Sequence, residues 1–324
     1  MCTALTYSTD VHYFGRNLDL EYSYNETVTI TPRNYPFVFR RTDTIKNHYA
    51  MIGMAYVTDG YPLYYDATNE MGLSMASLNF PEYAHYNSYQ DGKDNISTFE
   101  LIPWIIGQCK NVEEAKKLLA CINITDDVFN DMLPLGTLHW IIADRNSAIT
   151  VEAMKDGLKI FDNTIGILTN SPPFEVQMFN LNNYMSVTAG IPVNVFSDKI
   201  DLKTYSRGMG GIGLPGDFSS MSRFIRATFV KLNSVCNKTG TQGLSQFFHI
   251  LNAVAHPRGC VCMGNNKYEV TVYSSCCDVD NGIYYYTTYD NSQITGVSMH
   301  NEQLDASELV SYPLITGQQI RIQN

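Results

Sequence analysis

The sequence predicts an α+β protein whose chain folds into a four-layer αββα sandwich. The secondary-structure patterns run in the order strands, helix pair, strands, helix pair, strands. Several strand segments are apolar on both faces, so a sheet built from them needs cover on both sides. No repeat and no low-complexity linker divides the 324 residues. We therefore expect residues 1–324 to form a single domain.

The first eighty residues contain mainly strand patterns. β-Prone runs at 3–8 and 11–15 are separated by a short turn, as in a hairpin. Residues 26–32 alternate apolar and polar side chains, which is typical of a half-buried strand. Residues 50–57 and 72–78 are almost continuously apolar, and they predict strands that are buried on both faces.

Two helices are predicted after these strands. Ser97 is followed three residues later by Glu100, a capping-box pattern that comes just before apolar residues at helical spacing over 101–109. Asn111 is a suitable cap for a second helix over 112–121, which has one apolar face. Two consecutive amphipathic helices indicate a helical layer that packs on a sheet.

The second half of the chain repeats this alternation. Apolar and β-branched runs between turn residues predict strands, and apolar residues at a helical period predict helices. The predicted strands cover 138–143, 148–153, 158–161, 166–168, 268–275, 282–289 and 293–299. The predicted helices cover 220–232 and 245–255.

Charge and hydropathy exclude two classes of partner. The formal net charge is −10, whereas a protein that binds nucleic acid or an anionic membrane needs a basic face. The chain does not open on a basic region followed by an apolar core, and no apolar run approaches the roughly 20 residues of a membrane helix. We therefore expect a soluble, cytoplasmic protein.

Cysteine spacing does not indicate a metal site. The 8 cysteines include no C-x-x-C pair, and the adjacent pair Cys276-Cys277 and the C-x-C pair at Cys260 are poor zinc spacings. In a reducing compartment we expect them to be buried or surface thiols. We expect no metal and no cofactor.

A glycine-rich segment imitates a nucleotide-binding motif. Gly208, Gly210 and Gly213 match the GxGxxG pattern, but residues 205–207 before it are not a buried strand. Residues 214–217 contain Pro and Gly, which would break the helix that the motif requires. A loop that needs positive φ explains the glycines better.

Cys2 is the first candidate for chemistry. If Met1 is removed, this residue carries a thiol and a free α-amine. A free α-amine has a pKa of about 7.7–8.0 and a thiol one of about 8.5, so both exchange protons near neutrality. A nucleophile with its own base needs no histidine. On position alone, we favour the interpretation that Cys2 is a small residue that merely tolerates methionine removal.

Two further residues have more than one interpretation. His139 lies in an apolar strand segment and is either the base for a cysteine nucleophile or, as we favour, a hydrogen-bonded core residue. Asp19 follows Arg16 by three residues and lies near Cys2 if the first two strands form a hairpin. Its pattern fits a site residue and a turn or salt-bridge residue equally well.

Ten short motifs, taken together, resemble the choloylglycine hydrolase family and, within it, the bile salt hydrolases of gut bacteria. They occur in order over nearly the whole chain, up to the segments 284–289 and 290–294. The motifs are Met1-Cys2-Thr3, Phe14-Gly15-Arg16-Asn17-Leu18-Asp19, Ile30-Thr31-Pro32-Arg33-Asn34, Tyr61-Pro62, Asn69-Glu70, Leu78-Asn79-Phe80, Leu138-His139-Trp140, Leu168-Thr169-Asn170-Ser171-Pro172, Gly213-Leu214-Pro215-Gly216-Asp217 and Ser222-Arg223-Phe224.

The resemblance implies an N-terminal nucleophile hydrolase with the αββα fold, usually tetrameric, that acts on glycine- or taurine-conjugated bile salts. Some relatives remove a propeptide, but only Met1 precedes Cys2 here, so loss of Met1 alone would mature the enzyme. Cys2 is then the nucleophile and its α-amine the general base. The remaining active-site positions that match are Arg16, Asp19, Asn79, Asn170 and Arg223.

The implied roles are physically reasonable. The thiolate sulfur attacks the amide carbonyl, the α-amine passes a proton to the leaving nitrogen, and water hydrolyses the thioester. Asp19 orients the amine. N–H groups of Asn79 and Asn170 donate to the developing oxyanion. Arg16 and Arg223 supply positive charge that favours thiolate over thiol.

The steroid part of such a substrate needs an apolar pocket. By similarity of position, the expected wall residues are Leu18, Tyr24, Thr58, Tyr65, Phe129 and Leu133. One departure from the family pattern is Ser77, where relatives often have glycine. Its side chain is expected to alter the approach to Asn79 only slightly.

Two other functions remain open on the sequence. Penicillin V acylase belongs to another branch of the same family, although Asn79 favours the bile salt branch because the penicillin branch commonly has tyrosine there. From a different class, the chain could be a non-catalytic protein that keeps the fold and carries amphiphiles. That alternative predicts a retained Met1 and indifference to Cys2→Ala.

Overall fold

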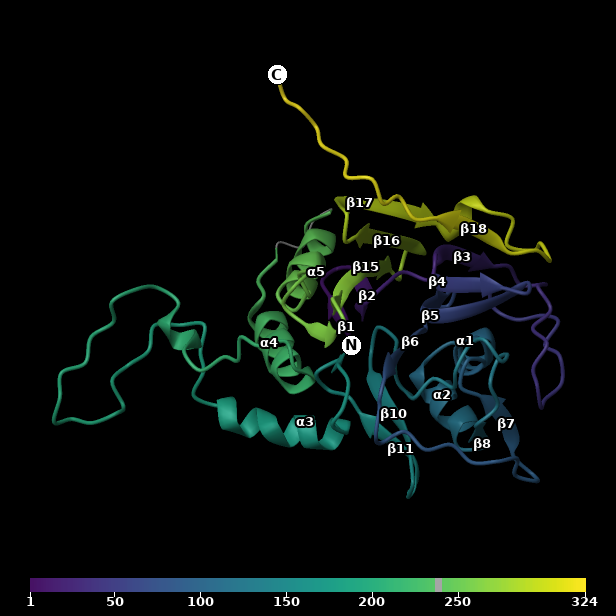
Figure 1. The fold of residues 1–324 in the computed structure, drawn as a ribbon, viewed down its shortest axis with the longest axis horizontal. Helices are drawn as coiled ribbons and strands as arrows, with labels where there is room; N and C mark the ends of the chain where they lie inside the picture. Colours follow the sequence, from purple (N-terminus) through teal and green to yellow (C-terminus); the bar gives the residue numbers. More distant parts are fainter. Residues whose placement is uncertain (237–240) are drawn as a thin grey trace.

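Two antiparallel sheets stacked face to face form the centre of the molecule (Figure 1). A computed structural model describes residues 1–236 and 241–324. The six-stranded sheet has the order β12 (Ile167–Leu168), β1 (Cys2–Ser8), β2 (His12–Leu20), β15 (Val270–Asp278), β16 (Ile283–Thr288) and β17 (Asn291–Ser298). The eight-stranded sheet has the order β11 (Gly157–Asp162), β10 (Ala148–Met154), β9 (Leu138–Ala143), β6 (Ser74–Asn79), β5 (Tyr61–Asn69), β4 (Met51–Thr58), β3 (Thr27–Thr31) and β18 (Val310–Pro313).

Helices cover the outer faces of both sheets (Figure 1). α4 (Ser220–Asn233) and α5 (Gln242–Asn252) pack against the six-stranded sheet. α1 (Leu101–Gln108) packs against β5 and β6 of the other sheet, with α2 (Val112–Leu119) beside it. Strands β1 and β2 contact β6 across the interior. The predicted four-layer αββα sandwich is therefore confirmed.

The eight-stranded sheet is buried on both faces, as its apolar runs predict. Ile52 and Ile141 belong to the core between the two sheets. Their chain neighbours Met51 and Ile142 belong to a second core under α1 and α2. Because successive side chains of a strand point to opposite faces, one apolar run supplies both cores.

The helix starts confirm one predicted cap and contradict the other. The Asn111 side chain accepts a hydrogen bond from the Glu114 N–H at 2.9 Å, so α2 begins as expected. The Glu100 carboxylate accepts from the Ser97 N–H at 2.9 Å, but the Ser97 hydroxyl has no hydrogen-bond partner among the described residues. α1 begins at Leu101 with Glu100 at its N-cap position and no side-chain cap, so the prediction of a capping box there is wrong.

Several elements have no counterpart in the prediction. Strand β5 contains Pro62 and Asp66, residues that are rare in central strands and hide its pattern. The other elements are short and are held by tertiary contacts more than by local propensity. They are β7 (Asp94–Ser97), β8 (Ile122–Thr125), α3 (Phe174–Asn180), β13 (Cys262–Gly264), β14 (Lys267–Tyr268) and β18.

The β1–β2 hairpin brings the first motif together. Its register pairs Cys2 with Leu18 at one end and Ser8 with His12 at the other. Gly15 lies where β2 meets β15, and a Cβ atom there would lie 2.0 Å from the Ser275 carbonyl oxygen. Only glycine permits this approach, which sets the position of the residues that follow it on β2.

A long segment between α3 and α4 runs away from the body of the molecule (Figure 1). We call residues 185–212 the arm. Gly208 at its end has φ +79° and Gly213 just beyond has φ +102°, with only a three-residue 3₁₀ turn between them. The glycine-rich pattern is thus a loop that needs positive φ, as the sequence predicts.

Candidate active site

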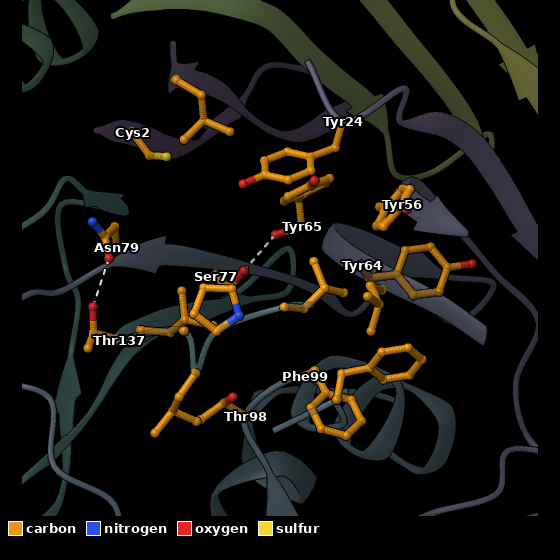
Figure 2. A pocket seen from close by; sticks show the side chains of 18 of the residues that line it. Cys2, Tyr24, Tyr56, Tyr64, Tyr65, Ser77, Asn79, Thr98, Phe99 and Thr137 are labelled. Atoms are coloured by element: carbon orange, nitrogen blue, oxygen red, sulfur yellow. Dashed lines mark hydrogen bonds between the residues drawn. The ribbon is translucent and has the colours of Figure 1, made fainter. Parts of the chain in front are cut away.

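Cys2 lies at the inner edge of a cavity of about 470 Å³. It is the first residue of β1 and is only 4% exposed. Figure 2 shows its sulfur at one end of the cavity, near Asn79. The thiol therefore meets the cavity while the backbone of Cys2 is held in the sheet.

Asn170 and Arg223 hold the backbone of Cys2. The Cys2 N–H donates to Asn170 Oδ1 at 2.7 Å, and Arg223 Nη2 donates to the same oxygen at 2.7 Å. Arg223 Nη1 donates to the Cys2 carbonyl oxygen at 2.5 Å. Arg223 is fully buried on α4, and burial lowers the pKa of its guanidinium while nearby Asp19 opposes that shift. A cation thus lies next to the nucleophile candidate.

Arg16 supplies a second buried cation on β2. Its Nη1 donates to the carbonyl oxygens of Tyr65 at 2.9 Å and Ser77 at 2.5 Å. Burial disfavours the charged form, but the Cys2 thiol, with smaller contributions from buried neighbours, raises the pKa of Arg16. Arg16 also lines the cavity beside Cys2. The two arginines therefore flank Cys2, as the resemblance implies.

Asp19 lies behind Cys2 and is fully buried. Its Oδ1 accepts a hydrogen bond from the Thr271 hydroxyl at 2.6 Å. Its Oδ2 accepts none from the described residues and lies 4.0 Å from Arg223 Nη1. One carboxylate oxygen is therefore fixed and the other remains available.

Met1 occupies the space next to Asp19. Its α-ammonium donates to the Asp19 carbonyl oxygen at 2.7 Å and forms an ion pair with Glu269. The Asp19 N–H donates back to the Met1 carbonyl oxygen at 2.9 Å. Burial lowers the pKa of this ammonium. While Met1 is attached, the nitrogen of Cys2 is an amide and has no basic lone pair.

Asn79 ends β6 at the mouth of the site. Its side-chain Oδ1 accepts from the Thr137 hydroxyl at 2.9 Å (Figure 2), and its carbonyl oxygen accepts from Asn170 Nδ2 at 2.7 Å. The resemblance implies that Asn170 donates to an oxyanion, but one of its two amide hydrogens is thus engaged. Its second amide hydrogen and the Asn79 side-chain amide are the donors that remain.

The cavity wall contains five of the six predicted pocket residues. Leu18, Tyr24, Tyr65, Phe129 and Leu133 line it, whereas Thr58, at the end of β4, does not. Other wall residues were not predicted, and most of them are apolar or aromatic. They include Leu20, Tyr56, Leu63, Tyr64, Phe99, Val128, Pro134 and Leu135.

The sequence contains a periodicity signal for some of the wall residues that were not predicted. Arg16, Leu18 and Leu20 alternate along β2 and therefore share one face, so Leu20 follows from Leu18 by strand periodicity. Ser77 also lines the cavity, and its hydroxyl donates to the Tyr65 carbonyl oxygen at 3.2 Å. Thr271 had no such signal, because it reaches Asp19 only through the pairing of β15 with β2.

His139 is a structural residue of the core, as favoured above. It is fully buried and stacks on Phe80 with ring centroids 4.3 Å apart. Its Nδ1 lies 3.0 Å from Glu152 Oε1, and its Nε2 lies 2.9 Å from the Thr169 carbonyl oxygen. Both ring nitrogens are used, so it is not available as a base for Cys2.

The described part of the chain contains neither a metal-binding cluster nor a membrane-spanning helix. Within residues 1–236 and 241–324, no group of three or more His, Cys, Asp or Glu side chains is arranged to hold a metal ion. In the same part of the chain, no helix has the length and apolar character needed to cross a membrane.

Comparison with known proteins identifies the family. Residues 2–312 match the family model of linear amide C–N hydrolases, choloylglycine hydrolase family. The chain is 55% identical over 314 residues to a bile salt hydrolase/transferase of Lactiplantibacillus plantarum, covering 97% of both chains. It is 40% identical over 318 residues to one from Clostridium perfringens, covering 96% of both.

Solved structures agree with this assignment. A crystal structure of the C2A mutant of the conjugated bile acid hydrolase from Clostridium perfringens superposes with a TM-score of 0.93 at 39% identity, covering 100% of both chains. Penicillin V acylase from Agrobacterium tumefaciens superposes with a TM-score of 0.77 at 18% identity, covering 96% of this chain and 90% of that one. That second likeness shows the shared fold. The chain therefore belongs to the choloylglycine hydrolase family and is a hydrolase of linear amide C–N bonds.

Proposed function

We propose that this protein hydrolyses the amide bond of glycine- or taurine-conjugated bile salts, with Cys2 as the nucleophile after Met1 is removed. The observation that carries the proposal is the position of the Cys2 thiol at the end of a largely apolar cavity of about 470 Å³. A steroid nucleus needs such a volume and such walls. The printed names of the relatives, bile salt hydrolase and conjugated bile acid hydrolase, support the substrate class.

The reaction has two steps. The Cys2 thiol gives its proton to the α-amine, its sulfur bonds the amide carbonyl carbon, and the C–N bond breaks as the amine passes that proton to the leaving nitrogen. Water then attacks the thioester, the same amine accepts its proton, and the C–S bond breaks to release the bile acid and restore the Cys2 thiol. Asn170 Oδ1, which already accepts from the Cys2 nitrogen at 2.7 Å, orients the amine. Asp19 Oδ2, which accepts no hydrogen bond from the described residues, is the proposed second acceptor for the amine.

Stabilisation of the tetrahedral intermediate falls to the donors at the cavity end. The side-chain amide of Asn79 and the second hydrogen of Asn170 Nδ2 are the proposed oxyanion donors. Arg16 and Arg223 are buried, so their positive charge near Cys2 is little screened. The five wall residues named above are proposed to contact the steroid.

A substrate panel tests the proposal. Purified protein is assayed for kcat/KM on glycocholate, taurocholate and penicillin V, and its N-terminus is read by intact mass. We expect loss of the mass of methionine and at least tenfold preference for a bile salt conjugate. A preference for penicillin V would move the chain to that branch of the family. Full activity with Met1 retained would overturn the α-amine as base.

The same experiment separates the enzyme from a carrier. A non-catalytic amphiphile-binding protein would bind glycocholate in a calorimeter without releasing glycine. Release of stoichiometric excess glycine over hours excludes that alternative, and its absence with clear binding would favour it.

We further propose that the protein assembles into a homotetramer. The arm extends away from the body (Figure 1). It exposes apolar side chains that a lone subunit would leave in water. Ile191, Val193, Val195, Phe196 and Tyr205 are between 76% and 86% exposed. Light scattering on the intact protein and on a Val195→Asp, Phe196→Asp variant tests this. A tetramer that becomes smaller in the variant supports the proposal, and a monomeric native protein contradicts it.

We also propose that the chain is a single domain. The two hydrophobic cores share the strands of the eight-stranded sheet, so neither could unfold without exposing the other. One coincident urea transition, followed by near- and far-ultraviolet circular dichroism, is the expected result. Two separate transitions would contradict it.

A further inference from the structure

His256 lies directly behind the candidate catalytic centre. It follows α5 and precedes β15, and it is 1% exposed. Neither ring nitrogen has a hydrogen-bond partner among the described residues. Its Nε2 lies 3.9 Å from Asp19 Oδ2, the carboxylate oxygen that likewise accepts no hydrogen bond from them. A buried donor and a buried acceptor thus face each other without bonding.

A buried donor and a buried acceptor that form no hydrogen bond destabilise the folded protein. A buried polar group left unpaired costs about 1–3 kcal/mol, so native structures rarely keep two side by side. A shortening of the 3.9 Å distance by about 1 Å would bring the pair to ordinary hydrogen-bond length. The local structure therefore favours a closer contact than the one present while Met1 is attached.

The backbone already ties His256 to Asp19. The His256 N–H donates to the Thr271 hydroxyl oxygen at 2.7 Å, and the Thr271 N–H donates to the His256 carbonyl oxygen at 3.1 Å. The same hydroxyl donates to Asp19 Oδ1 at 2.6 Å. His256 is therefore fixed relative to one carboxylate oxygen and aimed at the other.

The charged groups around the ring come from three elements. Asp19 on β2 favours the imidazolium, whereas Arg223 and Arg226 on α4 and the α-ammonium of Met1 oppose it. Phe218 packs edge-on at 5.2 Å between ring centroids. Burial is the largest influence and lowers the pKa of His256 to about 4. Near neutrality the ring is a neutral imidazole that carries one N–H.

The geometry of the contact indicates which nitrogen carries that hydrogen. A cavity of about 550 Å³ includes His256 in its wall, but both ring nitrogens are buried. A carboxylate oxygen can only accept, and Asp19 Oδ2 lies 3.9 Å from Nε2. The tautomer with its hydrogen on Nε2 is therefore the one that can pair with Asp19.

We propose that His256 is a positioning residue for catalysis: in the processed enzyme its Nε2–H bonds Asp19 Oδ2 and holds the carboxylate in the orientation that directs the α-amine of Cys2. Removal of Met1 frees the space beside Asp19 that its α-ammonium occupies. A neutral donor fixes Asp19 without cancelling its negative charge. This role rests on the proposed function, because it acts through the α-amine.

Three variants of the full-length, processed protein test it. His256→Leu removes the donor and keeps bulk, and His256→Gln restores a donor of similar reach. His249→Gln is the matched control, since His249 is an exposed histidine of the same cavity. With glycocholate, we expect His256→Leu to lower kcat about 10–100-fold, the cost of a misdirected group, with KM within about twofold. His256→Gln should recover most of kcat, and the control should stay within about twofold of the native enzyme.

The pH profile distinguishes positioning from packing. Without the donor, Asp19 directs more of its charge at the α-ammonium, so the acid limb of kcat/KM should move to higher pH in His256→Leu only. An unchanged kcat and pH profile in His256→Leu would overturn the proposal. So would equal losses in His256→Gln and His256→Leu accompanied by equal drops in melting temperature.

A substrate-free measurement keeps this test independent of the proposed function. The rate of iodoacetamide alkylation at Cys2, followed by mass spectrometry of its peptide, is recorded against pH. If glycocholate, taurocholate and penicillin V are all inert, the function proposal fails. A shifted alkylation profile in His256→Leu, restored in His256→Gln, would still support the role of His256, and superimposable profiles would refute it.

Discussion

The two ends of the β1–β2 hairpin both bury polar groups, but they use them differently. At the Cys2 end, Asn170 and Arg223 hold the backbone of the nucleophile, and a cavity opens beside it. At the far end, His12 binds Ser8 at 2.8 Å between ring nitrogen and hydroxyl, and Lys231 donates to backbone carbonyls of the segment before β12. His12 and Lys231 line a different cavity, of about 560 Å³, whose wall does not include Cys2. The two ends therefore differ in whether a nucleophile meets the cavity, not in whether a cavity is present.

The far end also shows what burial alone does to ionisable groups. Burial lowers the pKa of Lys231 to about 7 and that of His12 to about 4. Neither residue lines the 470 Å³ cavity. A shifted pKa is therefore a poor guide to catalysis in this protein unless geometry places the group beside Cys2.

The largest expected difference between the two ends comes from Cys2→Ala. Loss of the nucleophile should lower kcat/KM on glycocholate by roughly 10³-fold or more, because the remaining groups only bind and polarise the substrate. The fold should persist, since alanine fits the same strand position. Steady-state kinetics and circular dichroism check this. Residual activity above about a tenth of the native value would exclude Cys2 as nucleophile.

A pair of asparagines on either side of β12 sharpens the comparison. Asn170 follows this strand and Asn163 precedes it, and both are buried with three or more side-chain hydrogen bonds. Asn170→Ala should lower kcat about 10²–10³-fold, because it removes an oxyanion donor and the acceptor for the Cys2 nitrogen. Asn163→Ala should leave the kcat of the folded enzyme nearly unchanged.

Both substitutions should cost stability, by about 1–3 kcal/mol in urea unfolding, because each leaves buried groups unpaired. The two variants should therefore differ in kcat although their stabilities are similar. Equal losses of kcat in the two variants would mean that Asn170 acts only by supporting the fold.

How well the sequence predicts the residues near Cys2 depends on whether they lie in the same hairpin or in distant segments of the chain. Cys2, Arg16 and Asp19 share one hairpin, so their proximity follows from strand pairing alone. Asn170 and Arg223 reach the site from distant segments, and only the ordered motifs of the family indicated them.

Other residues had no local signal at all. Thr271 meets Asp19 through the register of β15 on β2, and this register includes a bulge between Thr271 and Tyr273 that no pattern in the sequence reveals. His256 reaches the site only through the same strand. The missed strand β5 has the same explanation, since tertiary pairing overrides its weak propensity.

The cavity wall is the least predictable part, because much of it consists of loop. Residues 127–137 between β8 and β9 contribute Phe129 and Leu133, whereas Thr58 lies outside the cavity. Loop conformation is set by neighbours such as Phe99, whose ring centroid lies 5.2 Å from that of Phe129. Similarity of position is therefore a weaker guide there than on the strands.

A substitution in the cavity wall should affect substrate binding, whereas a substitution at the catalytic centre affects the rate of reaction. Leu133→Ala removes apolar contact with the steroid and should raise KM for glycocholate about 5–10-fold, with kcat changed by less than about twofold. Met132→Ala is the control, because Met132 is next in the chain but 86% exposed and outside the cavity. Equal KM values for the two variants would show that the steroid does not contact this loop.

The smallest expected effect lies at the far end and concerns stability against pH. The folded-state pKa of His12 is about 4, below its ordinary value of 6.5, so the unfolded chain binds the proton first. The stabilisation is complete above pH 6.5 and is lost as the pH falls towards 4. For a single group this amounts to about 1–2 kcal/mol between pH 7.5 and 5.

His12→Gln removes the titrating ring but keeps a partner for Ser8, so its urea midpoint should fall less over that interval than the native midpoint does. His249→Gln, which removes an exposed histidine, should track the native protein. Parallel curves for His12→Gln and the native chain would show that this end of the hairpin does not sense pH, and that its buried histidine is neutral in both states.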